Sequence, residues 1–550
     1  MQPTYDVVVI GSGFGGAITA CRLAQAGRSV CILEKGQRWP REQFPRSPGE
    51  LATTGLWREN HNGYPGRGFI EYRTFRRMDV VQGVGVGGGS LHYFNVHIQP
   101  PAFIFRTPVW PEAITLERLQ PYYRVAAQML GANAITPPEN RHLPLRTVAF
   151  EDAVASTGKT AERVPICVRF GSQVTESVGG HLQSPCEYCG NCLLGCHVHA
   201  KNTLDLNYIA LAEAEGAEVF PQRQVLGIRP LPHGYRVRFR DLRDSPDAPS
   251  LIVDAAQVVV AAGTLGSNEL LLRCKYRDKT LPDLSRRLGH RFSGNGDFLY
   301  AGTRYPRRIV DPGRGPSITA GVGYREKNDD YIFIEDLGYP DPFIWYFNGV
   351  LPTRGRLRHA WQQLRRYAAD SLGSQYAFEF DQLLDEGYLT HFLPYLGMAT
   401  DASDGRLRLN RHGDIELDWS FRRSRPLFRK MIKRMQTLSQ ASGGEFVNSF
   451  LWASPKLGLP VGKTLTAHPL GGCAVSVSPR TGVTNDLGEV WGYPGLFVAD
   501  GSLMPAALGV NPSATICAMA ERVAFHMVNR RELQNEDELT PINTGLRRAS

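Results

Sequence analysis

The sequence lacks any long uninterrupted apolar run. Nowhere in its 550 residues is there a stretch of about 18 apolar residues, which is close to the minimum for a transmembrane helix. A β-branched run that predicts a strand begins soon after Tyr5, which leaves no space before it for a secretory signal peptide. We therefore expect a cytoplasmic protein without a transmembrane helix.

Clustered charge is also scarce. The formal net charge is +9, but the basic residues are dispersed and no nucleic-acid recognition motif accompanies them, so a solvated basic surface is favoured over nucleic-acid binding. Residues 354–368 combine apolar residues at helical spacing with five arginines. They predict an amphipathic helix, which packs on its own core or, as the alternative, rests on an anionic membrane as a peripheral contact.

Disulfides are not expected either. The chain has 10 cysteines and no export signal, which favours reduced thiols or metal ligands. Its length exceeds one hydrophobic core, so we expect two or three domains. The sequence leaves the oligomeric state undetermined.

The strongest motif lies in residues 5–34. Val7–Ile10 reads as a buried strand that enters the glycine turn Gly11-Ser12-Gly13-Phe14-Gly15-Gly16. Ala17–Ala26 predicts a helix, and Val30–Leu33 predicts a second buried strand that ends at Glu34.

Each part of this motif suits a dinucleotide. Gly11 permits a tight turn, Gly13 lets a diphosphate approach the backbone, and Gly16 allows helix and strand to pack closely. The helix N-terminus faces the phosphates. Glu34 follows where an acid can bond the hydroxyls of an adenosine ribose. The motif does not separate FAD from NAD.

Four cysteines are clustered with the spacing C-x₂-C-x₂-C-x₃-C. They are Cys186, Cys189, Cys192 and Cys196. This spacing equals the bacterial ferredoxin run, in which the fourth cysteine serves a second cluster. No second run is present, so Cys167 or another group would have to complete an iron–sulfur cluster. A zinc site with His197 or His199, or reduced cysteines without a metal, are the alternatives.

Two later segments carry a family resemblance. Residues 83–96, GVGVGGGSLHYFNV, are too glycine-dense for a packed element and suit backbone that passes against a ligand. They resemble the second glycine signature of the glucose-methanol-choline (GMC) oxidoreductases, in particular of the cholesterol oxidase branch. The segment from Ala467 to Thr515, with AHPLGGC, GLFVADGSLMP and GVNP, resembles the carboxyl-terminal signature nearly residue for residue.

The resemblance implies FAD as the cofactor and assigns site residues. His468 and Asn511 would face the reacting carbon at flavin N5, where an imidazole and a carboxamide suit an alcohol. Glu335, in IFIEDLGYP, resembles the catalytic glutamate of cholesterol oxidases, and a surface or structural carboxylate is its alternative. Together with the first motif, the resemblance gives these cofactor-binding residues: Gly11, Ser12, Gly13, Phe14, Gly16, Glu34, Lys35, Gly83, Gly87, Gly88, Ser90, His92, Asn95, Val225, Ala262, Gly263, Asp500, Gly501, Asn511 and Thr515.

His92 departs from the cholesterol oxidase branch, which resembles this segment but has an apolar residue there. In some other members, a histidine two positions after this serine is bonded covalently to the flavin 8α-methyl group. A hydrogen-bonding neighbour of the flavin is the alternative reading of His92.

The expected fold class is α/β. A Rossmann-like FAD-binding domain would comprise residues 1–110, 186–298 and 462–550, and a discontinuous α+β substrate domain or cap would comprise 111–185 and 299–461. Aromatic residues that alternate through the latter region predict an antiparallel sheet with one buried face. Residues 110–132 predict a helix that Pro111 opens and Pro121 breaks or kinks.

The function that follows is FAD-dependent oxidation of a bulky apolar secondary alcohol, such as a 3β-hydroxysteroid, with Glu335 available to isomerise the product. Molecular oxygen or an electron carrier would accept the electrons. One alternative is an iron–sulfur-containing GMC alcohol dehydrogenase. Another is a GMC-fold flavoenzyme without net redox chemistry, such as an isomerase or a lyase.

Overall fold

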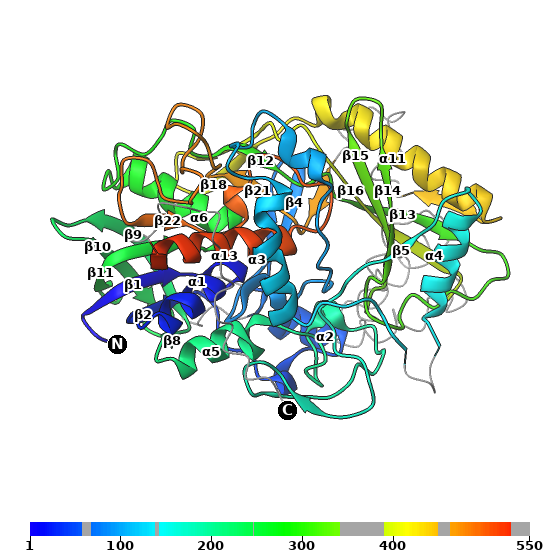
Figure 1. Cartoon of the computed structure of the whole chain (residues 1–550), viewed down its shortest axis with the longest axis horizontal. Coiled ribbons are helices and arrows are strands. Elements are labelled where there is room, and N and C mark those ends of the chain that lie inside the picture. The colour runs from blue at the N-terminus through cyan, green and yellow to red at the C-terminus, as the bar shows by residue number, and fades with distance from the viewer. Residues whose placement is uncertain (58–67, 138–141, 246, 341–389, 449–462, 530–550) are drawn as a thin grey trace, which may run out of the picture.

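The computed structural model describes residues 1–57, 68–137, 142–245, 247–340, 390–448 and 463–529 (Figure 1). A helix-covered sheet that includes both β1 and β22 lies on the left in Figure 1, and a second sheet flanked by two helices lies on the right. The described chain passes between these two parts several times, so each of them is built from separate segments of sequence.

The first sheet is the nucleotide-binding type that the glycine motif predicts. Its seven strands are β8 (Glu218–Phe220), β2 (Val30–Leu33), β1 (Thr4–Ile10), β11 (Leu251–Val260), β10 (Tyr235–Asp241) and β9 (Arg223–Pro230), with β22 (Leu496–Val498) also paired to β11. Strands β8, β2, β1, β11 and β22 are parallel, whereas β10 and β9 continue the sheet antiparallel. The mixed α/β class expected from the sequence is confirmed.

Strand β11 pairs with both β10 and β22. Its first half lies antiparallel to β10, in the hairpin that the alternating sequence predicts, and its last three residues lie parallel to β22. Alternating residues at Tyr235–Asp241 and Leu251–Asp254 predict a surface hairpin, and the apolar run that begins at Gln257 predicts a separate strand. The structure has a single strand, because β1 pairs with residues 254–260 of β11, across the gap between the two predicted strands, and holds that backbone extended.

Four helices pack around this sheet and on one another. They are α1 (Phe14–Gln25), α5 (Tyr208–Ala214), α6 (Gly263–Leu272) and α13 (Ser513–Asn529). Helix α1 contacts both α5 and α13. An ion pair joins the first and last of these helices along the chain, since Arg22 Nε lies 2.8 Å from Glu521 Oε2 with both side chains buried.

Helix α3 (Leu116–Met129) packs on α13 and corrects two predictions. It begins after Thr115, whose side chain accepts a hydrogen bond from the Arg118 peptide N–H, and not at Pro111. The helix also runs unbroken through Pro121, so the predicted break is wrong, whereas the alternative of a kink there stays a prediction. Because Pro121 lies in the second turn, it removes only the bond to the carbonyl of residue 117, a loss that the packing of the helix offsets.

The second sheet is antiparallel throughout. Its strands are β19 (Glu445–Asn448), β13 (Phe298–Arg304), β16 (Phe392–Ala399), β15 (Tyr331–Asp336), β14 (Ala320–Arg325) and β5 (Glu162–Arg163). Helices α11 (Phe421–Ala441) and α4 (Leu145–Ala155) contact it and lie at the right in Figure 1. The prediction of an antiparallel sheet is confirmed for the described residues.

The prediction of one buried face is wrong for the central strands. Every residue of β16 is buried, as are the last five of β15. Packing explains this, because Met431 and Met435 of α11 approach Gly397 so closely that no Cβ would fit there. Several of the aromatic residues that suggested this sheet, from Phe343 to Phe380, lie outside the described residues.

Three small sheets and one short helix complete the described structure. They comprise β18 (Ile415–Asp418), β17 (Gly405–Leu409), β12 (His290–Ser293) and β21 (Leu470–Gly472); β20 (Thr464–Thr466), β4 (Met78–Gly83) and β3 (Ile70–Thr74); β6 (Thr175–Glu176) and β7 (Leu182–Gln183); and α2 (Pro48–Glu50). The sheet that contains β12 joins residues of the predicted FAD-binding domain to residues 405–418 of the predicted substrate domain.

No described helix has the length and apolar content to cross a membrane. The amphipathic helix predicted at residues 354–368, and with it the predicted membrane contact, lies outside the described residues.

Candidate active site

Two glycines of the first glycine turn are packed too closely for a side chain. A Cβ on Gly11, where φ is +95°, would lie 2.4 Å from the Ala261 carbonyl oxygen, and one on Gly16 would lie 2.0 Å from the Gly11 oxygen. Gly13 differs, because the nearest atom to its Cβ would be Gly88 Cα at 3.9 Å. Gly11 and Gly16 are therefore required by the protein itself, whereas the space beside Gly13 is open to a ligand.

Three distant segments meet at this turn. A Cβ on Gly88 would lie 2.6 Å from Gly13 Cα, which brings the second glycine segment against the first. A Cβ on Gly15 would lie 1.9 Å from the Ala499 oxygen, which brings the carboxyl-terminal signature there as well. The structure thus brings together the segments that the sequence predicted to line one cofactor.

Glu34 joins the two glycine segments. Its buried carboxylate accepts hydrogen bonds from Ser12 N at 3.0 Å, Ser12 Oγ at 2.7 Å, Gly36 N at 2.8 Å and Gly85 N at 3.1 Å. Burial raises the pKa of this carboxyl group. Since about four acceptor positions exist on a carboxylate, protein donors occupy them here, and the predicted bond to a ribose stays a prediction.

The neighbouring lysine is also paired within the protein. Lys35 Nζ lies 3.0 and 3.1 Å from the two carboxylate oxygens of Glu71. The geometry therefore assigns Lys35 an ion pair, and its predicted contact with the cofactor stays a prediction.

The second glycine segment leaves β4 and tightens into a 3₁₀ turn at Gly88–Leu91. Ser90 Oγ donates to the Gly87 carbonyl at 2.7 Å and accepts from the Leu204 peptide N–H at 3.0 Å. At Gly83, a Cβ would lie 2.3 Å from the Gly88 oxygen. This backbone is held by its own bonds and lies against Gly13.

His92 is buried just beyond this turn. Burial, together with the nearby charges of Lys201 and His468, lowers the pKa of His92 to about 3. The ring is therefore neutral at physiological pH. A covalent bond to the flavin and a hydrogen bond to it both stay predictions.

Two further buried side chains nearby have unsatisfied polar atoms. Among the described residues, Asn95 Oδ1 and Nδ2 and both ring nitrogens of His97 have no hydrogen-bond partner. Unpaired buried groups of this kind cost about 1–3 kcal/mol each, and a ligand with its own donors and acceptors removes that cost. His97 was not predicted from the sequence, although it lies two residues after Asn95 in the same segment.

The remaining predicted cofactor residues lie in several different elements. Asp500 is buried and caps the turn Gly501–Leu503 by accepting from the Ser502 N–H at 2.9 Å. Thr515 Oγ1 lies 2.8 Å from Tyr123 Oη, a buried pair that the sequence did not predict. The other predicted residues are Ala262, which precedes α6; Gly263, with φ +77°; Phe14, in edge contact with Tyr93; and Val225, in β9.

His468 is held by a carboxylate that sequence reasoning missed. Its Nδ1 donates to Asp297 Oδ1 at 2.8 Å, and Asp297 Oδ2 accepts from Thr466 Oγ1 at 2.9 Å and from the Ala467 N–H at 3.0 Å. Asp297 is almost completely buried, whereas the His468 side chain keeps 16% of its surface exposed. This arrangement places the proton on Nδ1 and leaves Nε2 as an acceptor.

Glu335 and Asn511 form a second pair. Asn511 Nδ2 donates to Glu335 Oε2 at 3.3 Å, and both side chains are buried. Burial raises the pKa of Glu335 well above its ordinary value, and the charges of Asp336, Asp297 and Glu162 add to this effect. Glu335 Oε1 and Asn511 Oδ1 have no partner among the described residues, so one buried acceptor on each lacks a protein donor.

Asn295 positions the Asn511 segment. Its Nδ2 donates to the Val510 carbonyl at 2.7 Å, and its Oδ1 accepts from the Leu508 and Gly509 N–H groups, each at 2.9 Å. Asn295 and Asp297 belong to the five residues Ser-Gly-Asn-Gly-Asp at 293–297. This short turn therefore holds the His468 side chain and the backbone that precedes Asn511, and its run of turn-forming polar residues was the available signal.

The four clustered cysteines do not form the predicted metal site. Cys186 Sγ accepts from the Tyr188 N–H at 3.4 Å, and burial together with the neighbouring thiols of the run raises the pKa of Cys186, Cys189 and Cys196. Over the described parts of the chain, no group of three or more His, Cys, Asp or Glu residues is placed to hold a metal ion. Nearby, His197 bonds Glu187 at 3.0 Å. The C-x₂-C spacing fixes separation along the chain but not convergence.

Comparisons with known proteins agree with this geometry. Residues 6–319 match the family model described as FAD dependent oxidoreductase, and residues 401–520 match that described as GMC oxidoreductase. A cholesterol oxidase of Mycobacterium tuberculosis (strain ATCC 25618 / H37Rv) is 30% identical over 559 residues, covering 97% of this chain and 92% of the relative. A cholesterol oxidase of Acinetobacter baumannii is 28% identical over 572 residues, covering 97% and 96%.

A solved structure of a fungal aryl-alcohol oxidase has a similar fold. Its TM-score is 0.60 at 16% sequence identity, and the match covers 96% of this chain and 100% of the other. The fold and the two adjoining glycine segments define an FAD-dependent oxidoreductase that acts on alcohols. Within that class, the chain belongs to the GMC oxidoreductase family.

Proposed function

We propose that this enzyme oxidises the secondary hydroxyl group of a bulky apolar alcohol and that a 3β-hydroxysteroid is its substrate class. The observation that carries the proposal is the Asp297–His468 bond beside the buried Glu335–Asn511 pair. The names of the relatives at 30% and 28% identity support the sterol. We further propose that residues 1–110, 186–298 and 462–550 bind FAD and that 111–185 and 299–461 bind the substrate.

The residues present fit FAD. The open space beside Gly13, between the two glycine segments, suits a diphosphate, and the unpaired polar atoms of Asn95 and His97 suit the donors and acceptors of a flavin ring. When bound, FAD would supply the acceptor for the hydride that leaves the carbinol carbon. The protein supplies orientation and proton transfer.

His468 takes the hydroxyl proton in this proposal. Because Asp297 fixes the proton on Nδ1, Nε2 is the nitrogen that presents a lone pair to the substrate. A positioned base of this kind contributes about 10²–10⁴-fold to a rate. Asp297 also stabilises the imidazolium that forms when the hydroxyl proton arrives.

Asn511 and Glu335 act on the other side of the hydroxyl group. Asn511 orients the alcohol with an amide that does not titrate. Glu335, once ionised, takes a proton from C4 of a 3-keto-5-ene steroid and returns it at C6, which isomerises the product. Burial favours this role because it raises the pKa of Glu335 and so strengthens its carboxylate as a base.

The proposed electron acceptor is molecular oxygen. The relatives at 30% and 28% identity are named oxidases, and the four clustered cysteines are not placed to hold an electron-carrying cluster. The products would then be the ketone and hydrogen peroxide.

Anaerobic mixing of the purified flavoprotein with alcohols tests the proposal. Cholesterol should bleach the flavin absorbance faster than a long-chain primary alcohol or an aryl alcohol, and readmission of air should restore it with release of hydrogen peroxide. Faster bleaching by a primary alcohol would reject the sterol. No bleaching by any alcohol would point to a lyase or isomerase without net redox chemistry.

A further inference from the structure

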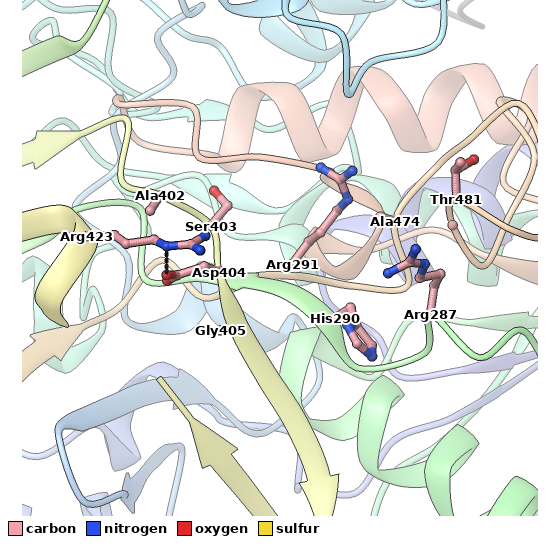
Figure 2. Close-up of a pocket in the computed structure, with 11 residues that line it drawn as sticks. Arg287, His290, Arg291, Ala402, Ser403, Asp404, Gly405, Arg423, Ala474 and Thr481 are labelled. Carbon is pink, nitrogen blue, oxygen red and sulfur yellow. Dashed lines mark ion pairs between the residues drawn. The ribbon is translucent and has the colours of Figure 1, made fainter. Parts of the chain in front are cut away.

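A pocket of about 320 Å³ opens on the surface at β12 and β17, beyond the end of β12 opposite to Asp297 (Figure 2). Its size lies at the lower end of the range of small-molecule sites. Three separate segments and one side chain of α11 line it: Arg287, His290 and Arg291; Ala402, Ser403, Asp404 and Gly405; Ala474, Thr481 and Gly482; and Arg423.

Cationic groups dominate this pocket. Arg287, Arg291 and Arg423 contribute three guanidinium groups, and Asp404 is the single carboxylate of the lining. That carboxylate is matched by Arg423, whose Nε lies 3.7 Å from Asp404 Oδ2, as the dashed line in Figure 2 marks. Two guanidinium groups therefore remain without a carboxylate of the pocket to neutralise them.

These two guanidinium groups are placed to bind a ligand. Arg287 Nε donates to the Arg480 carbonyl at 2.9 Å, which fixes the side chain and leaves its terminal nitrogens available. Arg291 is half-buried and, among the described residues, makes no ion pair with a carboxylate. Planar guanidinium groups bind oxyanions with two parallel hydrogen bonds.

The positive charges around this pocket repel one another and lower the pKa of two of its side chains. Burial and then the charge of Arg287 lower the pKa of Arg291. Burial and then the charges of Arg406, Arg287 and Arg291 lower the pKa of His290. A bound anion would raise the pKa of Arg291 and of His290, because an opposite charge stabilises the protonated forms.

The backbone at Arg291 is also unusual. Its φ is +64°, a backbone conformation that residues other than glycine and asparagine rarely adopt. The pairing of β12 with β17 also shifts register between His290 and Phe292. Such strain persists where the surrounding structure imposes it, often at binding sites. Here it accompanies the placement of the Arg291 guanidinium at the pocket.

Asp404 adds a feature that selects among anions. Its Oδ1 is buried and has no hydrogen-bond partner among the described residues. We propose that this pocket binds a phosphate-type oxyanion that carries a hydroxyl hydrogen, either hydrogen phosphate or a small phosphate monoester in its singly protonated form. Arg287 and Arg291 bind the oxygen atoms, and Asp404 Oδ1 accepts the hydroxyl hydrogen. Sulfate has the same shape but no hydrogen at neutral pH, so it binds more weakly.

Isothermal titration of the holoenzyme with inorganic phosphate, glycerol phosphate and sulfate tests the proposal. We expect saturable phosphate binding at 0.1 M salt, where exposed charges are largely screened, and about tenfold or more weaker binding of sulfate, since one hydrogen bond to a charged group is lost. Absence of phosphate binding overturns the site. Equal affinity for sulfate overturns the role of Asp404.

Variants at Arg291 separate binding from folding. Arg291→Asn removes the charge but suits the positive φ, so it should fold and weaken phosphate by about tenfold or more. Arg291→Lys keeps the charge but loses the paired hydrogen bonds of the guanidinium, so its affinity should lie between those of Arg291→Asn and the wild type. Arg411→Asn, at an exposed arginine outside the pocket, is the matched control and should leave the affinity unchanged. Full affinity in Arg291→Asn overturns the proposal.

A lipid headgroup is the other source of the same chemistry. Vesicles of phosphatidylcholine with and without phosphatidic acid, sedimented with the holoenzyme, distinguish it from soluble phosphates. Phosphate monoester binding without vesicle binding supports a soluble ligand. Vesicle binding that Arg291→Asn abolishes keeps the anion site and assigns it to a lipid, whereas vesicle binding that Arg291→Asn leaves intact overturns the site as the cause.

Discussion

Nδ1 of His468 donates a hydrogen bond to Oδ1 of Asp297 at 2.8 Å, and this bond joins two parts of the chain 171 residues apart. Asp297 immediately precedes β13, and His468 lies between β20 and β21. The carboxylate also receives bonds from Thr466 and Ala467. The orientation of the imidazole is therefore set by the protein before any substrate enters.

Replacement of Asp297 by Asn should lower kcat roughly 10²-fold or more, because the amide can donate to Nδ1 and thereby favour the wrong tautomer of His468. Steady-state turnover of the alcohol substrate measures this loss. The flavin content should not change. Asp247→Asn, at an exposed acid, is the control, and wild-type turnover in Asp297→Asn would exclude Asp297 from positioning the imidazole.

Replacement of Glu335 by Gln should change how stability depends on pH. The folded pKa of Glu335 is raised above 4.5, so its stability contribution is present below pH 4.5 and is lost as pH rises toward the folded pKa. Gln does not titrate. The variant should therefore gain stability relative to the wild type by about 1.4 kcal/mol per pH unit within that window.

Urea unfolding of both proteins at a series of pH values from acid to neutral measures this difference. A stability difference that does not depend on pH would show that Glu335 ionises equally in the folded and unfolded states. The same variant should convert a 3-keto-5-ene steroid more slowly if Glu335 moves the proton.

Alanine at two glycines of the first turn should have separable effects. Gly16→Ala places a Cβ 2.0 Å from backbone and should destabilise the fold by about 1–3 kcal/mol or more. Gly13→Ala meets no protein atom closer than 3.9 Å, so it should fold normally but bind less FAD. Thermal melting and the flavin-to-protein absorbance ratio measure these outcomes. Full flavin content in Gly13→Ala would contradict a diphosphate at that position.

Replacement of Asn295 by Ala should remove three hydrogen bonds to residues 508–510 and lower kcat, because Asn511 follows this segment directly. The matched control is Asn410→Ala, since Asn410 Oδ1 likewise accepts from two peptide N–H groups but lies in an exposed turn. Both variants should lose stability, Asn295→Ala by about 1–3 kcal/mol because its partners are buried, and Asn410→Ala by less because water replaces its bonds. Only Asn295→Ala should lose turnover, and equal turnover losses would assign Asn295 a structural role alone.

The nucleotide-binding part of the fold could be predicted because its determinants are local. The strand, glycine turn and helix of residues 5–34 each depend on neighbours in the sequence. Strand β11 could not be predicted as one unit, because its halves pair with β10 and β22, whose positions are set by the rest of the sheet.

The candidate site was predictable only in part. His468 and Asn511 stand in a recognisable signature, but Asp297 and Asn295 bond partners 171 and more than 200 residues away, which no local pattern reveals. The cysteine run failed for the opposite reason. Its spacing is suggestive, yet convergence of four sulfur atoms depends on backbone geometry that spacing does not determine.

The bonds that Glu34 receives from Ser12, Gly36 and Gly85 are all internal to the polypeptide. The two glycine segments that we propose to bind FAD are thus joined by bonds within the polypeptide itself. Deflavinated apoprotein should consequently stay folded at this site and accept synthetic flavin analogues of altered redox potential, which makes the enzyme suitable for reconstitution studies.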